Sequence, residues 1–528
     1  MGGGLLQLVA YGAQDVYLTG NPQITFFKMI YRRYTNFSME SIQQSFSSTV
    51  DFGRKVSATI SKNGDLLHKT YIQVKLPQID CGTSSENRFR WLNWLGHIMI
   101  KSVDIEIGGQ QIDKHYSEWM HIWNELTQDS GKKEGYASMI GNVPRLTQVV
   151  QGHANASTLI DSQNVLDSQG AIPSIILYIP LNFWFCRSPG LALPLIALQY
   201  HDIKINVEFR DASDCCWATG KYVTTPPSIT SAVLYCDYIY LDTEERRKFA
   251  EAEHEYLIEQ LQFRGNEATT STNNKVKLAF NHPVKMLAWV TQPIDYTNNI
   301  FTNDYGGKQW FNFSDQIDVS YYNGTPQDAL GPGLISSNNM NFGLPLIGTG
   351  SIIDTSQQTP GSENPQYRPD TGTITGNGIS ASSVSTLSGG FANILAPSIA
   401  SSFDSNVTSS NIPLFDFGSN CTDTAKLTLN GHDRFSERDN RYFNLVQPYQ
   451  HCTNIPSVGI NMYSFALEPE KLEPTGTCNF SRIDISHLLL NLTPQTVKDS
   501  RVAHIRIYAL SYNILRISNG MGGLAYAN

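Results

Sequence analysis

The stretch DIKINVEF at residues 202–209 decides the fold class, because apolar and polar side chains alternate along it without interruption. Successive side chains of a β-strand point to opposite faces of a sheet, so this alternation predicts a strand with one buried face and one wet face. Similar patterns recur at 72–76, 103–107, 276–280 and 505–507. The chain is therefore predicted to be mostly β.

Helical spacing is the exception in this sequence. One case follows Ser117, where apolar side chains recur at the spacing of a single helix face: Trp119, Ile122, Trp123 and Leu126. Residues three and four positions apart share one face of a helix, so a short covering helix is predicted here.

A second helix is predicted from Thr243 to about Leu261. Asp242 suits the N-cap position and Glu245 stands three residues further on, which is the pattern of a capping box. The residues expected to face inward are Phe249, Tyr256, Leu257 and Leu261. The helix follows a domain boundary that we place near 223–231, where VTTPPSITS holds two prolines and no charge.

The two halves of the chain show weak self-similarity. SVDIEIGGQQID at 102–113 and AKLTLNGHDRF at 425–435 both run alternating apolar residues into a glycine turn. Both halves then continue through an aromatic-rich strand, a bend with Pro and Gly, and another strand, around 183–209 and 463–492. The repeat predicts two copies of one β-sandwich.

Size and composition set outer limits on the function. The 528 residues exceed the roughly 250–300 at which one core stops growing, so at least two domains are expected. Only 16% are charged, against about 25% in an average soluble domain, which indicates surface buried against partners. The net charge of −9 repels phosphate, so no specific nucleic-acid partner is expected.

Eight scattered cysteines without a CxxC pair favour a reducing compartment, and the start does not resemble a secretion signal.

Residues 323–420 have a different composition from the rest. Gly, Ser, Thr, Asn and Pro dominate, and Arg368 is the only basic residue. Scattered apolar residues distinguish the segment from a plain linker. It is predicted to be an insertion of partly ordered surface loops and not a third core.

No constellation for catalysis, cofactor binding or metal binding emerges. His115, Glu118 and His121 could lie close together at the first predicted helix, but they lack the HExxH spacing, so they are interpreted as helix-surface polarity. Cys215 and Cys216 are interpreted as structural cysteines rather than a redox pair. The glycine clusters at 2–4 and 520–523 lack the context of a phosphate loop, so flexible terminal arms are predicted there.

A basic and aromatic patch lies near the N-terminus. Its basic residues are Lys28, Arg32 and Arg33, and its aromatic residues are Phe26, Phe27, Tyr31 and Tyr34. Contact with nucleic acid or an anionic membrane and a packing arm with solvated charges both stay open at this point.

The opening GGGLLQLVAYGAQDVYLTGNPQITFFKMIYRRYTNF at 2–37 resembles the N-terminus of major capsid proteins from nucleocytoplasmic large DNA viruses, the mimivirus, phycodnavirus and iridovirus group. Further similar blocks follow in order: VDFGRKVSATISKNGDLLHKTYIQVKLP, HIMIKSVDIEIGGQQIDKHYSEWMHIWNEL, IPLNFWFCRSPGLALPLIALQYHDIKINVEF, LNGHDRFSERDNRYFNLVQPYQH, YSFALEPEKLEPTGTCNFSRIDI and NILRISNGMGGLAYAN. The resemblance spans nearly the whole chain and departs from about 299 to 421.

The resemblance implies two consecutive eight-stranded jelly rolls, three chains in a pseudo-hexagonal capsomer, and the shell of an icosahedral virion assembled in the host cytoplasm. Minor capsid proteins, penton proteins and an inner viral membrane are the implied partners. It also implies that the terminal arms lie on the inner side and the 323–420 loops outside. We therefore expect Lys28, Arg32 and Arg33 to help anchor the base of the tile.

The expected organisation follows from the repeat and the resemblance together. It is an arm at 1–35, a first jelly roll at 36–225, a second at 226–515 with a loop insertion at about 299–421, and an arm at 516–528. Three alternatives stay open: a minor capsid paralogue, a carbohydrate-binding β-sandwich, and a cupin-like enzyme that would need clustered His and carboxylate ligands.

Overall fold

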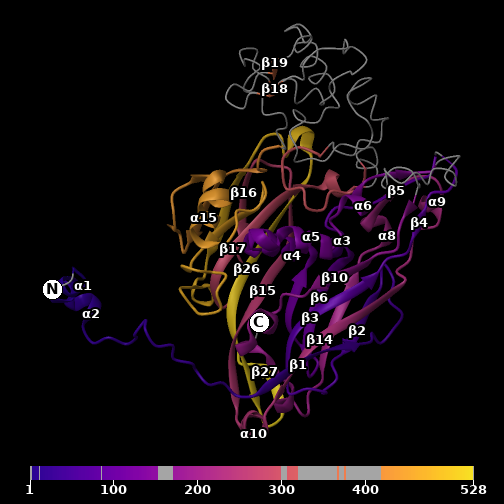
Figure 1. Cartoon of the computed structure of the whole chain (residues 1–528). Coiled ribbons are helices and arrows are strands. Elements are labelled where there is room, and N and C mark those ends of the chain that lie inside the picture. The colour runs from indigo at the N-terminus through magenta and orange to yellow at the C-terminus, as the bar shows by residue number, and fades with distance from the viewer. Residues whose placement is uncertain are drawn as a thin grey trace.

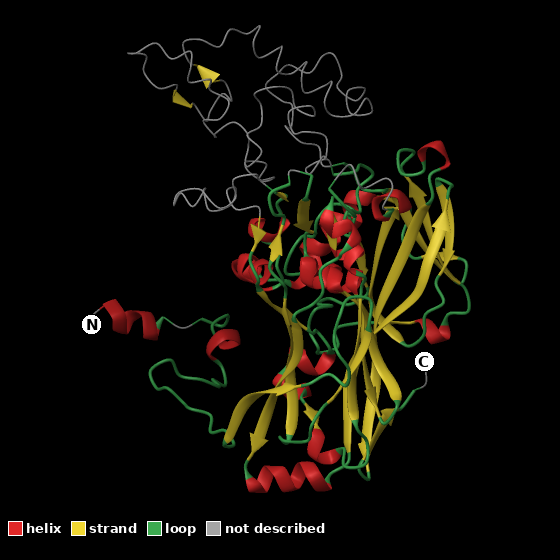
Figure 2. Cartoon of the chain, turned by 90° about the vertical axis from the view of Figure 1, so that its right-hand side faces the viewer, coloured by secondary structure: helices red, strands yellow, loops and turns green. Residues whose placement is uncertain are grey.

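The computed structural model describes residues 3–10, 12–84, 86–152, 171–298, 306–318 and 418–526, with a short strand pair β18 (Gln366–Tyr367) and β19 (Ile374–Thr375). Two β-sandwiches follow one another along the chain, as Figures 1 and 2 show. Each consists of two antiparallel sheets of four principal strands. The two sandwiches agree with the repeat, and the fold is the double jelly roll that the resemblance implied.

The first sandwich has two sheets, named here after their first strands. The β1 sheet has the order β1 (Phe37–Gln44), β14 (Ser231–Leu241), β3 (Leu66–Lys75), β10 (Ile176–Pro180). The β2 sheet has the order β2 (Lys55–Thr59), β12 (Ile203–Phe209), β6 (Ile100–Ile107), β7 (Gln110–Tyr116).

The second sandwich repeats this order strand for strand. The β15 sheet has the order β15 (His254–Thr269), β26 (Ala503–Ser518), β17 (Pro283–Pro293), β23 (Asn461–Ser464). The β16 sheet has the order β16 (Asn273–Lys277), β25 (Ser486–Leu492), β20 (Thr422–Leu429), β21 (His432–Asp433). Each strand of one sandwich therefore has a counterpart at the same topological position in the other.

Short helices and two-to-four-residue strands fill the connections. The helices are α1 (Gly3–Val9), α2 (Val16–Thr19), α3 (Leu95–Met99), α4 (Ser117–Thr127), α5 (Lys133–Met139), α6 (Pro144–Thr147), α7 (Trp184–Arg187), α8 (Ala212–Cys215), α9 (Lys221–Thr224), α10 (Thr243–Glu251), the π-helical turn η8 (Tyr442–Val446) and α15 (Gln447–His451). The minor strands are β4 (Ile79–Asp80), β5 (Arg88–Trp91), β8 (Val150–Gln151), β9 (Ala171–Ile172), β11 (Leu193–Pro194), β13 (Cys216–Ala218), β22 (Arg438–Asp439), β24 (Cys478–Asn479) and β27 (Met521–Leu524).

The alternating stretch at 202–209 forms β12, between β2 and β6. Ile203, Ile205 and Val207 face the sandwich core, as predicted. Asn206, expected on the wet face, is buried, and its side-chain amide donates a hydrogen bond to Asp104 Oδ2 at 2.7 Å. The alternation thus identified the strand correctly, but the second face of the sheet is only partly exposed.

The predicted helix from Thr243 to Leu261 is wrong in its second half. Asp242 caps α10 as expected, since its carboxylate accepts a hydrogen bond from the Thr243 N–H at 2.8 Å. The helix ends at Glu251, and from His254 the chain forms β15, which pairs with β26. Ladder hydrogen bonds and burial against β26 outweigh a helical spacing that short apolar runs also satisfy.

The predicted domain boundary near 223–231 lies too early in the chain. Strand β14 begins at Ser231 and pairs with both β1 and β3, so it completes the first sandwich. The chain passes to the second sandwich only after β14, through α10. The proline-rich stretch is therefore a connection inside the first sandwich and not a linker between domains.

Two stretches inside the predicted insertion belong to the folded body. Residues 306–318 pack on the first sandwich, where the Trp310 indole N–H donates to the Asp214 carbonyl at 2.8 Å. Residues 418–421 meet them, since the Asp315 N–H donates to the Ser419 carbonyl at 2.9 Å. Apart from these residues and the strand pair of β18 and β19, the predicted loops at 323–420 lie outside the described residues.

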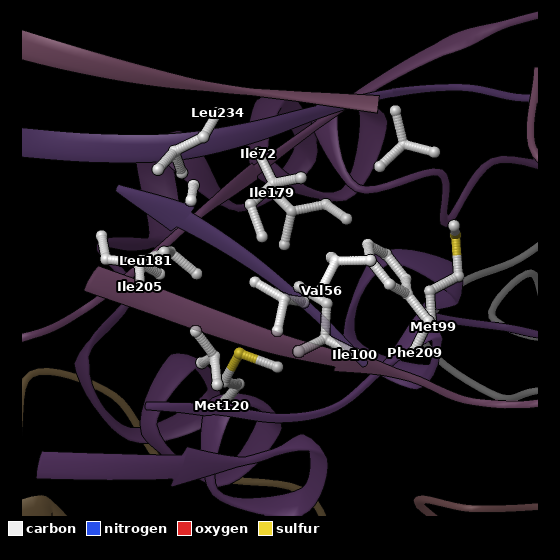
Figure 3. Packing of buried hydrophobic residues seen from close by; sticks show 14 of the residues in the cluster. Val56, Ile72, Met99, Ile100, Met120, Ile179, Leu181, Ile205, Phe209 and Leu234 are labelled. Carbon is white, nitrogen blue, oxygen red and sulfur yellow. The ribbon is translucent and has the colours of Figure 1, made fainter. Parts of the chain in front are cut away.

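Each sandwich encloses its own apolar core. The first includes Val56, Ile205 and Phe209 from the β2 sheet and Ile72 and Leu234 from the β1 sheet, and Figure 3 shows these side chains converging from both sides. The second core includes Trp289, whose ring is tilted against that of Phe443 with ring centroids 5.1 Å apart. Two separate cores in one chain are expected at this length.

Replacing Ile205 by Ala removes a fully buried side chain from the centre of the first core. The change is expected to lower the free energy of unfolding by about 2–5 kcal/mol, because the cavity left behind collapses only partly. Lys204→Ala on the same strand is the control, with an expected effect within about 0.5 kcal/mol. Urea denaturation followed by tryptophan fluorescence measures both. Equal effects of the two changes would contradict this packing.

Candidate functional site

Helix α4 joins the two sandwiches. It follows β7 of the first sandwich, as predicted, and lies against the outer face of the β15 sheet. Its apolar side chains Trp119, Ile122, Trp123 and Leu126 form a cluster with Leu261, Met286, Ala288, Val290, Met462, Tyr508 and Leu510 of the second sandwich. The predicted covering helix therefore covers the neighbouring sandwich.

A buried ionic cluster lies at the same junction. The Glu259 carboxylate of β15 binds the Arg187 guanidinium of α7 through one oxygen and the Lys285 ammonium of β17 through the other. Arg187 also stacks over Trp123 at 4.1 Å from the ring centroid. Burial lowers the pKa of Lys285 to about 8, and the charge of Glu259 opposes this shift. The cluster ties one residue of the first sandwich to two of the second in a site that water barely reaches.

One member of this cluster stands out in the sequence. Lys285 stands alone in the apolar run PVKMLAWV at 283–290. A buried charge has to be paired, since isolation of an ion from water costs several kcal/mol. The partners Arg187 and Glu259 lie far away in the sequence, so only the fold identifies them.

The C-terminal glycines do not form the flexible arm that the sequence predicted. Strands β26 and β27 form a hairpin that reaches back to the first sandwich. The Tyr200 N–H donates to the Gly520 carbonyl at 3.0 Å, and the Gly522 N–H donates to His201 Nδ1 at 3.2 Å. Gly520 adopts φ +78°, and a Cβ on Gly522 would come within 2.6 Å of Leu198. Glycine is needed here for a turn and a close approach.

The N-terminal arm leads away from the body. Figures 1 and 2 show residues 3–35 extending from the start of β1. Phe26 and Phe27 are 87% and 97% exposed, and the neighbouring apolar residues Ile24, Met29, Ile30, Tyr31 and Tyr34 are exposed as well. So much apolar surface on a single segment marks an interaction site.

The predicted anchoring residues Lys28, Arg32 and Arg33 lie on this arm, and all three are exposed. The arm segment that carries them extends away from both sandwiches in Figure 1. Their role as anchors stays a prediction. No helix among the described residues is long and apolar enough to cross a bilayer.

The residues considered for metal or redox chemistry are each engaged elsewhere. The interpretation as helix-surface polarity is wrong for both histidines, because His115 lies in β7, buried against Asp113 at 3.0 Å, and His121 of α4 is buried and stacks on Phe311. Glu118 of α4 contacts Arg210 at 3.1 Å. Within the described part of the chain, no three His, Cys, Asp or Glu residues converge as metal ligands. Cys215 and Cys216 are buried, and burial raises the pKa of Cys216 to about 12, which suits structural thiols.

Two family models cover almost the whole chain. Residues 25–242 match the model described as the major capsid protein N-terminus. Residues 245–523 match the model of the large eukaryotic DNA virus major capsid protein. The chain belongs to this capsid protein family. The division between the two models falls at α10, where the fold passes from the first sandwich to the second.

Relatives and solved structures agree with this membership. The major capsid protein of Phaeocystis pouchetii virus is 46% identical, and the match covers 100% of both chains. That of Paramecium bursaria Chlorella virus 1 is 36% identical at the same coverage. A quasi-atomic model of the PBCV-1 virus capsid is 30% identical with a TM-score of 0.59, covering 96% of this capsid chain and 100% of that one. The Faustovirus major capsid protein, at 12% identity, shares the fold with a TM-score of 0.63 and coverage of 96% and 94%.

Replacing Glu259 by Ala leaves two cations buried without their counter-ion in this capsid protein. We expect the free energy of unfolding to fall by about 3–5 kcal/mol. The matched control is Glu255→Ala on the same strand as Glu259, which breaks the exposed ion pair of Glu255 with Arg516 of β26. This change should lower the free energy of unfolding by less than about 1 kcal/mol. Urea denaturation compares the two. A Glu259→Ala loss as small as that of the control would show that the cluster does not hold the junction.

Proposed function

We propose that the chain assembles into homotrimeric, pseudo-hexagonal capsomers that tile the icosahedral shell of a large double-stranded DNA virus. The observation that carries the proposal is the strand-for-strand repeat of one sandwich within a single chain. Three such chains around one axis present six similar units, which is the shape of a tile that fills a flat lattice. Heterologous contacts between identical chains close into a ring when the rotation permits.

The rigid junction between the sandwiches supports this proposal. A tile needs its two units at a constant relative position in every copy. Helix α4, the Glu259 cluster and the C-terminal hairpin all connect the first sandwich to the second. The role we assign is structural, without catalysis and without a cofactor.

The solution mass of the purified chain tests the trimer. Light scattering should give about three times the chain mass of 58.8 kDa, because the proposed capsomer holds three copies. A dilution series to low micromolar concentration separates a stable trimer from weak association. A persistent monomer that binds glycans on an array would favour the carbohydrate-binding alternative instead.

The inner surface of the tile is the proposed place of the N-terminal arm. We propose that Lys28, Arg32 and Arg33 anchor the base of the capsomer to minor capsid proteins, penton proteins or an anionic inner membrane in virions assembled in the host cytoplasm. Exposed basic and aromatic side chains on one arm support such an anchor. Basic residues near an anionic surface contribute about 1 kcal/mol each.

Reversal of these three charges tests the anchor. The triple change Lys28→Glu, Arg32→Glu, Arg33→Glu should leave the trimer intact but reduce the yield of assembled particles at least about tenfold, since three attractive contacts become repulsive. Electron microscopy of particles from infected or co-expressing cells measures the yield. The control carries Lys132→Glu, Arg145→Glu and Lys221→Glu, three exposed changes on the first sandwich. Unchanged particle yield in the arm variant would refute the anchoring role.

A further inference from the structure

The second sandwich has its own counterpart of helix α4. In the first sandwich, α4 follows the hairpin of β6 and β7. In the second, η8 and α15 follow the equivalent hairpin of β20 with β21 and β22. Both helical segments therefore leave the same edge of the same sheet before the chain enters the last strand of the opposite sheet, β10 or β23.

One buried residue in each helical segment serves to align the two segments with each other. Met120 of α4 packs into the core of the first sandwich, and Phe443 of η8 packs into the core of the second. Two, three and six residues after Met120 stand Ile122, Trp123 and Leu126. Two, three and six residues after Phe443 stand Leu445, Val446 and Tyr449. Both sets are apolar throughout.

The two sets differ in what covers them. Ile122, Trp123 and Leu126 are buried against the outer face of the β15 sheet. The equivalent residues Leu445, Val446 and Tyr449 are 42%, 39% and 79% exposed. The second set thus carries the same apolar character as the first but lacks a sheet beneath it. We call Leu445, Val446 and Tyr449 the α15 surface.

The matching sheet face is uncovered on the first sandwich. In the β15 sheet, Met286 pairs with Leu510, and Met462 lies on the adjoining strand. The same positions of the β1 sheet hold Tyr71, which pairs with Tyr235, and Tyr178 on the adjoining strand. The ladder shifts register next to the Met286–Leu510 pair in the β15 sheet and one pair beyond Tyr71–Tyr235 in the β1 sheet, after Thr70–Cys236, so an irregularity lies close to the aligned pair in both sheets.

These three tyrosines form a continuous aromatic surface on the outer side of the β1 sheet. The rings of Tyr71 and Tyr235 stack at 5.3 Å, and the ring of Tyr178 lies 6.0 Å from that of Tyr71. Tyr178 is 39% exposed, whereas its equivalent Met462 is fully buried under α4. Tyrosine is enriched at protein interfaces because it buries a large ring while its hydroxyl stays hydrated. We call Tyr71, Tyr178 and Tyr235 the tyrosine face.

We propose that the α15 surface of one copy packs on the tyrosine face of the next copy, repeating between chains the contact that α4 makes within the chain. The inference rests on the proposed trimer and names its interface. A ring of three copies then holds six contacts of one kind, three within chains and three between them. The partner is a second copy because the within-chain contact supplies the template for both surfaces.

The first experiment removes the apolar character of the α15 surface. The double change Leu445→Asp, Tyr449→Asp should lower the mass in light scattering threefold, from trimer to monomer, at concentrations where the unchanged chain is trimeric. Val223→Asp, another exposed apolar position outside both surfaces, is the control and should leave the trimer intact. Circular dichroism and the thermal midpoint verify that each variant is folded.

The second experiment joins the two surfaces directly. A chain carrying both Tyr449→Cys and Tyr178→Cys, treated with a short bis-maleimide under native conditions, should give covalent dimers and trimers on a denaturing gel. Each single variant should stay at the monomer position, apart from any background through the half-buried Cys452 and Cys478 that the unchanged chain also shows.

The outcomes separate this interface from the proposed function. An unchanged chain that is trimeric, with a double Asp variant that is equally trimeric and a Cys pair that gives no extra product, overturns the interface and leaves the capsomer standing. An unchanged chain that is monomeric overturns both. Loss of the trimer in the Asp variant together with cross-linking of the Cys pair supports the interface.

Discussion

The burial of α4 between the two sandwiches is the constraint on which the rest of the structure depends. Its apolar face excludes water from the junction. Only in such a dry site does the Glu259 carboxylate interact strongly with Arg187 and Lys285, and only there would a missing partner be severely destabilising. The ionic cluster gives the junction a defined geometry that apolar contacts alone do not, because charged hydrogen bonds are directional.

Local sequence patterns correctly predicted the strands and helices with one apolar, buried face. β12 and α4 were identified because a single periodicity fits each of them and burial follows it. The segment after Glu251 was predicted wrongly because Tyr256, Leu257 and Leu261 satisfy a helical spacing as well as a strand, and pairing with β26 decides between the two. The choice depends on a strand more than two hundred residues away, which local spacing does not record.

The surfaces were less predictable than the elements. The basic and aromatic arm could be found because its residues are contiguous, whereas the tyrosine face combines β3, β10 and β14 from distant parts of the chain. Cluster residues such as Lys285 give a signal, a charge in an apolar strand, but not the identity of the partner. The C-terminal glycines were wrongly predicted to form a flexible arm, because glycine is compatible both with a flexible chain and with a close approach of two backbones. The hydrogen bonds of Gly520 and Gly522 with Tyr200 and His201 show that the close approach is formed.

The clasp where residues 314–315 meet 419–420 has a consequence for how such a protein can diversify. Ser314 bridges to Asn420, and the Ser419 N–H donates to the Asp315 carboxylate at 2.7 Å. The chain thus departs from and returns to the body at one point, and the entropy of closing an intervening segment grows only with the logarithm of its length. Sequence between the two ends of the clasp can lengthen, shorten or be exchanged at small cost to folding. The folded body therefore sets little constraint on the length or composition of the sequence that connects residue 318 to residue 418.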